Sequence, residues 1–197
     1  MILPGAQAFR LGVLRNLTSE ALQIQPCGID LTLRRVLRVK QSGLVDFDNS
    51  LRRPAETEEL AFPSSSSESN GSQSSSVYFA PSRDCERSVV NSITDGTDSL
   101  LHLPKGAYRV EFNEIVKMPL DVMGQVFTRS SVWRSLAWVE AGVMDAGYEG
   151  AVGAAIVVAN EEGIWVSRKA RLAQMVFHSM SEATVGYSGM YQGSKVV

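Results

Sequence analysis

The stretch Tyr108-Arg109-Val110-Glu111-Phe112-Asn113 alternates large apolar side chains with polar ones. Because successive side chains of a strand point to opposite faces, this pattern predicts a β-strand with one buried face. Further β-rich runs lie at residues 124–127, 151–159, 164–167 and 172–178, separated by Gly, Asn and Pro turns and without helical periodicity between them. Many short strands joined by turns indicate an all-β barrel or a jelly-roll-like sandwich.

Two further elements are predicted before this region. From Pro4 to Leu17 apolar residues recur four positions apart, which predicts a short N-terminal packing helix. From Ile29 to Lys40 apolar residues alternate, which predicts another strand. The pair Arg34-Arg35 interrupts that alternation, as expected for a β-bulge or a change of phase.

The composition changes between about residues 41 and 98, where serines crowd the segment from Ser64 to Ser76. Such a polar tract buries too little apolar surface to offset the entropy lost on ordering. We therefore expect a disordered, serine-rich insertion within a single domain that covers residues 1–197. A tolerated surface insertion is favoured over a regulatory element.

Size and charge narrow the classes of function. A chain of 197 residues with 44% hydrophobic content forms one sizeable core rather than two full domains. The net charge of -2 and the pI near 5.7 argue against general binding to nucleic-acid polymers or to anionic membranes. Without an apolar run that could span a bilayer or an evident signal peptide, an intracellular protein is expected, cytoplasmic or nuclear.

A second informative stretch contains Arg129-Ser130-Ser131 and, shortly after it, Asp145-Ala146-Gly147-Tyr148. Arginine presents a planar fork that matches phosphate oxygens, and serine hydroxyls donate to the same oxygens. An aspartate on a glycine-bearing turn can face an open cleft as a base. Each motif alone also has a structural explanation, since Gly147 suits a hairpin turn. Together the two motifs suit chemistry on a nucleoside triphosphate.

Five blocks of sequence, in their order, resemble the dUTPase and dCTP deaminase superfamily, closest to its archaeal-type dUTPase branch. The blocks are residues 25–31, 129–131, 141–150, 170–177 and 186–194. The resemblance implies a dUTPase-like distorted β-barrel and an obligate homotrimer with three composite sites. It also implies Mg²⁺, carried mainly by the triphosphate substrate.

The resemblance assigns a role to each candidate residue. Asp145 activates the water that attacks between the α and β phosphates, and Tyr148 packs against deoxyribose and leaves no room for a 2′-hydroxyl. Asp30 either supports the water shell of the metal or the neighbouring subunit, or has a structural role at the start of a strand. The phosphate chain would contact Arg129, Ser130, Ser131 and Gln174.

The last block departs from the arginine- and glycine-rich arm that closes over the nucleotide in standard dUTPases. It contains Tyr187, Tyr191 and Gln192, and either tyrosine could stack on the base. Backbone groups of the hairpin could recognise uracil without a special side chain, by accepting from N3–H and donating to O4. Trp133 and Trp138 are interpreted as core or interface residues rather than as base-stacking platforms.

Two chemistries remain to be separated. Non-zinc dCTP deaminases carry a glutamate on the strand after the D-x-G-Y turn, whereas residues 151–159 contain no acid. A zinc deaminase signature is also absent. This favours a dUTP diphosphatase that forms dUMP and pyrophosphate. A mono- or bifunctional dCTP deaminase remains an alternative, because Arg134 completes an R-S-S-x-x-R spacing that deaminases share. A non-catalytic nucleotide-binding member of the family is the third alternative.

Overall fold

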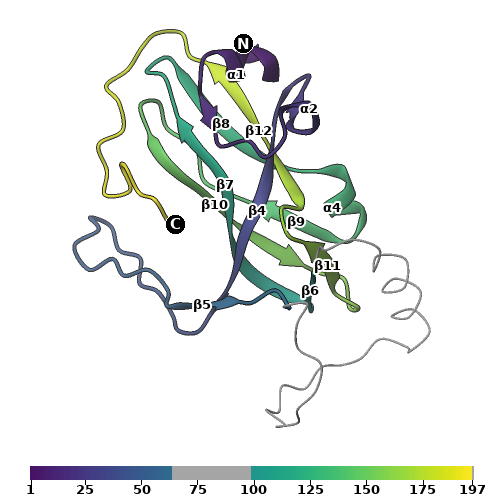
Figure 1. The fold of residues 1–197 in the computed structure, drawn as a ribbon. Helices are drawn as coiled ribbons and strands as arrows, with labels where there is room; N and C mark the ends of the chain where they lie inside the picture. The colour runs from purple at the N-terminus through teal and green to yellow at the C-terminus, as the bar shows by residue number, and fades with distance from the viewer. Residues whose placement is uncertain (64–98, 197) are drawn as a thin grey trace.

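The computed structural model describes residues 1–63 and 99–196, and strands dominate this part of the chain (Figure 1). The short helices are α1 (Gly5–Arg10), α2 (Glu20–Gln23) and α4 (Ser130–Arg134). The strands are β1 (Ile2–Leu3), β2 (Leu14–Arg15), β3 (Ile24–Gln25), β4 (Gly28–Val39), β5 (Thr57–Leu60), β6 (Leu100–Leu103), β7 (Gly106–Lys117), β8 (Val122–Thr128), β9 (Ala137–Glu140), β10 (Glu149–Val158), β11 (Ile164–Ser167) and β12 (Arg171–Ser179).

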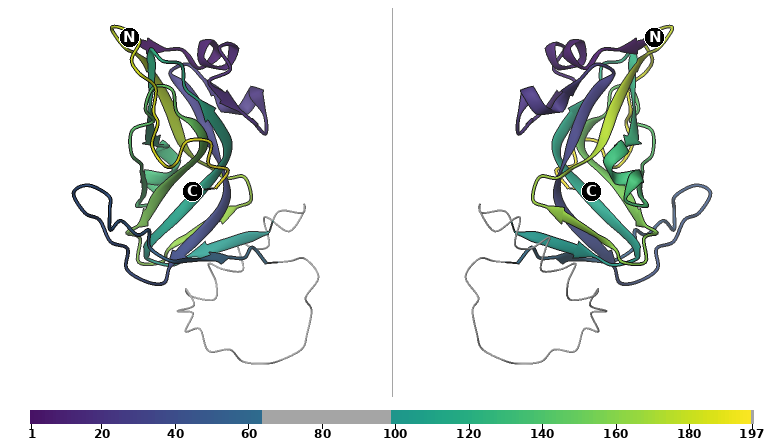
Figure 2. Two further views of the ribbon diagram at one scale, coloured as in Figure 1. Left: turned by 90° about the vertical axis from the view of Figure 1, so that its left-hand side faces the viewer. Right: turned by 90° about the vertical axis from the view of Figure 1, so that its right-hand side faces the viewer.

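The main sheet follows the order β1-β12-β4-β7-β10-β9, and neighbouring strands in this order are antiparallel. β2 pairs with β7, β3 and β5 pair with β4, and β8 pairs with β12, while β6 and β11 form a separate two-stranded sheet. The side views show that the main sheet is strongly curved (Figure 2). The fold is therefore mostly β, a sheet curled into a half-barrel, which confirms the predicted fold class.

One hydrophobic core lies inside this curled sheet and draws on its central strands. Because alternate residues of a strand face the same side, the core receives residues in steps of two from β4 and β7. Tyr108, Val110 and Phe112 are all buried, as their alternation predicts. Each fully buried large apolar side chain stabilises the fold by about 1.5–3 kcal/mol. Other core members are Ile29, Leu31, Leu33, Val116, Ile156, Met175 and Phe177.

Two glutamates of β7 are buried although their sequence pattern suggests polar outward positions. Glu111 accepts two hydrogen bonds from Arg35 of β4, at 2.8 and 2.7 Å. Glu114 accepts bonds of 2.6 Å from the side chains of Gln23 and Thr32, and its other oxygen accepts the Thr32 backbone N–H at 2.9 Å. Buried charges and polar groups are tolerated when they are paired in this way. The two carboxyls therefore fasten β7 to β4 and α2.

The N-terminal region differs from its prediction. The expected helix from Pro4 to Leu17 is limited to α1, which ends at Arg10. Gly12 then adopts a φ of 67°, a conformation that suits glycine and stops the helix, and β2 follows and pairs with β7. Apolar residues recur four positions apart in this segment because both the short helix and the following strand place apolar side chains in one core.

The predicted strands from Tyr108 onward are present, and the strand from Ile29 to Lys40 corresponds to β4. The register between β4 and β7 shifts between Leu33 and Arg35, so the predicted irregularity at Arg34-Arg35 is confirmed. The short strands β6 and β9 were not predicted. Trp133 and Trp138 are 52% and 39% exposed, so neither belongs to the core of this chain.

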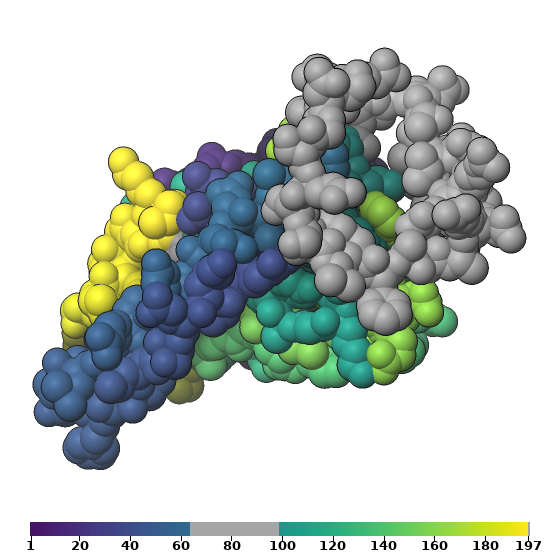
Figure 3. Space-filling view, turned by 90° about the horizontal axis from the view of Figure 1, so that it is seen from below, coloured from purple at the N-terminus to yellow at the C-terminus, as the bar shows by residue number. Residues whose placement is uncertain are grey.

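Part of the predicted insertion belongs to the fold. β5 pairs with residues 36–39 of β4, and Leu44 pairs with Arg53 at an isolated bridge. Seen from below, the segment up to residue 63 extends beside the C-terminal tail (Figure 3). Residues 64–98, which include the stretch from Ser64 to Ser76, lie outside the described residues. Within the described part of the chain, no helix is long and apolar enough to cross a membrane.

Candidate functional site

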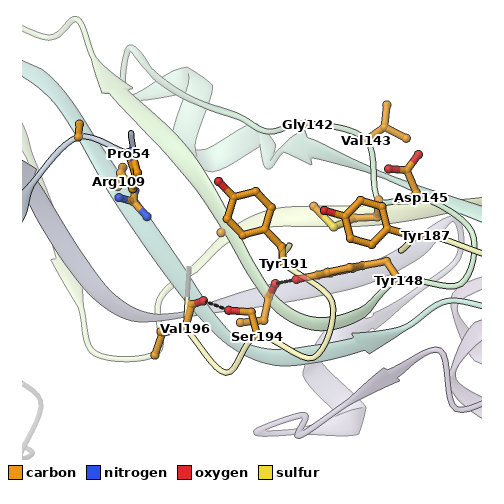
Figure 4. Close-up of a pocket in the computed structure, with 14 residues that line it drawn as sticks. Pro54, Arg109, Gly142, Val143, Asp145, Tyr148, Tyr187, Tyr191, Ser194 and Val196 are labelled. Atoms are coloured by element: carbon orange, nitrogen blue, oxygen red, sulfur yellow. Dashed lines mark hydrogen bonds between the residues drawn. The ribbon is translucent and has the colours of Figure 1, made fainter. Parts of the chain in front are cut away.

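A pocket of about 580 Å³ opens between the start of β10, the C-terminal tail and the segment near residue 54 (Figure 4). Most of its lining is apolar, with Asp145 and Arg109 as its charged members. A concave, mostly apolar pocket with a few polar groups is typical of small-molecule sites. Its lining residues are Pro54, Ala55, Arg109, Gly142, Val143, Met144, Asp145, Tyr148, Ala151, Gly153, Tyr187, Tyr191, Ser194 and Val196.

The turn from Asp145 to Tyr148 sets the edge of this pocket. Gly147 has a φ of +77°, and a Cβ there would lie 2.5 Å from the Cα of Gly186, so only glycine fits. The Tyr148 N–H donates to the Asp145 carbonyl at 3.1 Å, which closes the turn. The Asp145 side chain is exposed and, among the described residues, forms no ion pair. An exposed, unpaired carboxylate at a pocket edge can accept a proton from a bound water.

Tyr148 forms a fixed wall of the pocket. Its side chain is buried, and its hydroxyl donates to the Ala151 carbonyl at 2.8 Å. The Tyr187 ring meets it edge-on, with ring centroids 5.5 Å apart, a favourable geometry for aromatic pairs. Burial raises the pKa of the Tyr148 hydroxyl, and the neighbouring Tyr187 raises it further. The ring therefore presents a rigid, neutral surface.

The C-terminal tail occupies the free edge of β10 near the turn. The Gln192 carboxamide donates to the Gly147 carbonyl at 3.0 Å and accepts the Glu149 N–H at 3.1 Å. The backbone of residues 193–194 continues the contact, with bonds of 2.7 Å to the Glu149 carbonyl and 2.8 Å from the Ala151 N–H. The backbone groups of Gly147, Glu149 and Ala151, which could otherwise recognise a base near the turn, therefore form hydrogen bonds with the tail.

The tail also contacts the segment that follows β4. The Arg52 guanidinium lies 5.4 Å above the centre of the Tyr191 ring, within the range of a cation–π contact, and donates to the Met190 sulfur. Tyr191 and Tyr187 both line the pocket.

A second cluster gathers the candidate phosphate-binding residues around Asp30. The Asp30 carboxyl is 1% exposed and lies 2.9 Å from Arg129 Nε and 3.2 Å from Arg171 Nη1, and Gln174 donates to it at 3.2 Å. Burial raises the pKa of Asp30, although both arginines and Gln174 act in the opposite direction. These contacts support the structural role of Asp30 rather than the metal role.

The pocket and this cluster are separate in one chain. Ser130 and Ser131 begin α4, directly after Arg129, and Arg134 ends it with its guanidinium 4.7 Å above the Trp133 ring. None of these residues, nor Gln174, lines the pocket. α4 lies on the opposite side of the sheet from the C-terminal tail (Figure 1).

Sequence reasoning missed Arg109 of the pocket. The alternation in β7 marks it only as a polar residue on the outer face, which most often means contact with solvent. The signal that identifies it comes from pairing, because Arg109 lies opposite Ala155 and so faces the same side of the sheet as the pocket residues of β10.

Comparisons with known proteins agree with this architecture. A family model described as dCTP deaminase-like matches residues 6–180. A probable deoxyuridine 5′-triphosphate nucleotidohydrolase of Archaeoglobus fulgidus is 38% identical over 185 residues, covering 94% of this chain and 89% of that protein. A protein of the same name from Methanosarcina mazei is 34% identical over 181 residues, covering 91% of this chain and 86% of that protein.

One solved structure extends the comparison to the fold. The crystal structure of 2′-deoxycytidine 5′-triphosphate deaminase from Agrobacterium tumefaciens superposes with a TM-score of 0.55 and 19% sequence identity. The match covers 89% of this chain and 46% of that chain. At this identity, the likeness concerns the fold alone.

Proposed function

The chain belongs to the dCTP deaminase-like family, and from that premise we propose that it hydrolyses dUTP to dUMP and pyrophosphate. Relatives that match more than nine-tenths of the chain carry the name of that activity. The observation that carries the proposal is the turn that places Asp145 and Tyr148 together at one pocket.

Asp145 is the proposed general base. It is exposed at the edge of the pocket, and no cation among the described residues neutralises it, so it can orient a water and accept its proton. General-base assistance contributes roughly 10²- to 10⁴-fold to a rate. The water would attack the α phosphorus, break its bond to the bridging oxygen and release pyrophosphate.

Tyr148 is the proposed sugar-selecting residue. Its hydroxyl already donates to Ala151, and Tyr187 packs against its edge, so the ring cannot move away from a bulky sugar. A 2′-hydroxyl placed against this face would meet steric resistance and lose hydrogen bonds to water. Deoxyribose would lie there without either cost.

The phosphate chain is assigned to a second copy of the protein. Arg129, Ser130, Ser131, Arg134 and Gln174 do not line the pocket of their own chain, so a site that uses both sets requires another subunit. Large apolar side chains on β8, on α4, on β9 and in the turn between α4 and β9 are exposed, which is typical of a surface that another chain covers. They are Phe127 at 47%, Trp133 at 52%, Leu136 at 62% and Trp138 at 39%. These observations support composite sites between subunits, and the resemblance to dUTPases implies that the assembly is a homotrimer.

Magnesium fits this site as a partner of the substrate. The described residues contain no group of three or more His, Cys, Asp or Glu side chains that could hold a metal ion. Asp145 is the acidic side chain that lines the pocket, and Mg²⁺ commonly uses one or two carboxylates together with substrate phosphates and waters. When bound, the ion neutralises charge on the phosphate oxygens.

Hydrolysis is preferred to deamination because the pocket face of β10 presents Ala151, Gly153 and Ala155, none of which can transfer a proton. Deamination of cytosine needs such a group to move protons between water, N3 and the leaving amine. A nucleotide-binding member without activity is disfavoured by the exposed carboxylate beside the pocket.

The proposal is tested by pyrophosphate release from dUTP, dCTP and dTTP, each supplied with Mg²⁺. Rapid release from dUTP alone supports it, and its absence from dUTP overturns it. The composite site is tested by co-expressing Asp145→Asn and Arg129→Ala subunits. Activity well above that of either variant alone supports sites shared between subunits, because mixed trimers then contain some intact sites. Activity no higher than the two separate variants contradicts sharing.

A further inference from the structure

Arg109 is a cation at the far end of the pocket from Asp145. It belongs to β7 and pairs directly with Ala155 of β10. Side chains two apart on a strand share a face, so Arg109 lies on the same face as Ala151 and Gly153, which also line the pocket. In Figure 4 the tyrosines Tyr148 and Tyr191 lie between Asp145 and Arg109.

The guanidinium of Arg109 is available to a ligand. Across the described ranges, no hydrogen bond or ion pair engages it, although it is only partly exposed. Other partly buried arginines have carboxylate partners: Arg35 pairs with Glu111, and Arg129 pairs with Asp30. A guanidinium that is withdrawn from water without a partner loses hydration, which a ligand oxygen would restore.

The pairing of β10 indicates where a base can reach the backbone. Near the turn, the tail occupies the outer edge as far as Ala151, which donates to Ser194. Farther along, β9 occupies the same edge from Ala155 onward. Gly153 lies between these two paired stretches and lines the pocket. A base bound at this edge would therefore lie beside Gly153, on the face that also carries Arg109.

The order of groups along the pocket sets the direction of the nucleotide. Asp145 is assigned to the reacting phosphate and Tyr148 to the sugar, so the base must extend beyond Tyr148. Arg109 lies in that direction (Figure 4). A contact between Arg109 and the triphosphate would require the nucleotide to bind in the reverse direction.

We propose that Arg109 is a specificity-determining residue that donates a hydrogen bond to O4 of uracil. This inference rests on the proposed dUTP hydrolysis. Guanidinium has donors and no acceptor, whereas the group at C4 is an acceptor in uracil and an NH₂ donor in cytosine. Cytosine would therefore oppose donor to donor at Arg109. The residue both binds the correct base and disfavours the wrong one.

The test compares the binding of two nucleotides by calorimetry. The probes are dCTP and a non-hydrolysable α,β-imido analogue of dUTP, both with Mg²⁺. Arg109→Ala is expected to weaken binding of the uracil analogue roughly 10- to 100-fold, the range for a hydrogen bond to a charged group. It should strengthen dCTP binding, because the donor that opposes the cytosine NH₂ group is removed. Arg109→Gln should bind dCTP more tightly than wild type, because its carbonyl can accept from the NH₂ group.

Arg168→Ala is the matched control. Arg168 lies 4.7 Å from the Phe62 ring and does not line the pocket, so its loss should change neither affinity. If Arg109→Ala fails to fold, Arg109→Gln retains much of its volume, and its ratio of affinities carries the test. An equal loss of both nucleotides would overturn the proposal, because the contact would then be to sugar, phosphate or O2. Unchanged binding of both would overturn it as well.

Wild-type turnover and the base preference of the Arg109 variants separate the two proposed roles. If wild type releases no pyrophosphate from dUTP, the proposed function fails. If wild type hydrolyses dUTP but the Arg109 variants keep its preference for uracil, only the specificity role fails.

Discussion

Replacing Gln192 with alanine is expected to loosen the C-terminal tail without unfolding the half-barrel. The substitution removes two hydrogen bonds, one of 3.0 Å to the Gly147 carbonyl and one of 3.1 Å from the Glu149 N–H. A neutral hydrogen bond contributes about 0.5–1.5 kcal/mol net, so the pair contributes about 1–2 kcal/mol at this exposed position. The tail should then open roughly 5- to 30-fold more often.

Amide hydrogen exchange, followed by mass spectrometry, measures this opening. A peptide covering residues 188–196 should exchange faster in Gln192→Ala by the factor given above, while peptides from β7 and β12 should keep the wild-type rate. Ser188→Ala is the control, because Ser188 is exposed and its side chain is not among the tail's contacts with β10. Unchanged exchange of the tail in Gln192→Ala would refute the assignment of its docking to this carboxamide.

Three further predictions concern the site and the core. Asp145→Asn should lower kcat roughly 10²- to 10⁴-fold, and because its side chain is exposed the melting temperature should not change. Glu149→Gln is the control. Near-normal turnover of Asp145→Asn would contradict the assignment of Asp145 as the base. Tyr148→Phe should lower the unfolding free energy by about 1 kcal/mol, because the hydrogen bond to Ala151 is lost, but the enzyme should still prefer dUTP to UTP. Tyr148→Ala should lose that preference in a competition assay. If both variants prefer dUTP equally, the ring does not select the sugar. Burial raises the pKa of Glu114 above its ordinary 4.5, and this effect exceeds the opposite effect of the hydrogen bonds from Thr32 and Gln23. The protonated carboxyl therefore stabilises the fold fully at pH values below the pKa of Glu114 in the unfolded chain. This contribution is lost as the pH rises through the pKa of Glu114 in the folded chain. Unfolding free energy measured from pH 4 upward should therefore decline less in Glu114→Gln than in wild type, and parallel curves would contradict this.

The sequence predicted the sheet well because alternation reports burial directly. In β7, Tyr108, Val110 and Phe112 are buried as predicted, and the irregularity at Arg34-Arg35 appears as a register shift. The N-terminal helix was overestimated, because apolar spacing alone cannot show that the chain reverses at Gly12. Residues 41–63 carry β5, whose partner is β4, and a strand that depends on such a pairing has a weak signal of its own.

The site was only partly predictable. Asp145 and Tyr148 share one turn, so a local motif identifies both. The contact of Gln192 with Gly147 joins residues that are 45 positions apart, and Arg109 reaches the pocket only through its register with Ala155. Such relations depend on tertiary pairing and leave no local pattern. The separation of Arg129 from the pocket is likewise visible only in the folded chain.

The central claim is that the protein hydrolyses dUTP and does not deaminate dCTP. The most direct measurement supplies both nucleotides with Mg²⁺ in one reaction, with the cytosine ring of dCTP labelled with ¹³C and the dUTP unlabelled. Mass spectrometry of the separated products then identifies the source of each uracil nucleotide. The account predicts unlabelled dUMP, pyrophosphate in equal amount and intact labelled dCTP. Labelled dUMP or dUTP would contradict it, because only deamination of cytosine could produce a labelled uracil ring.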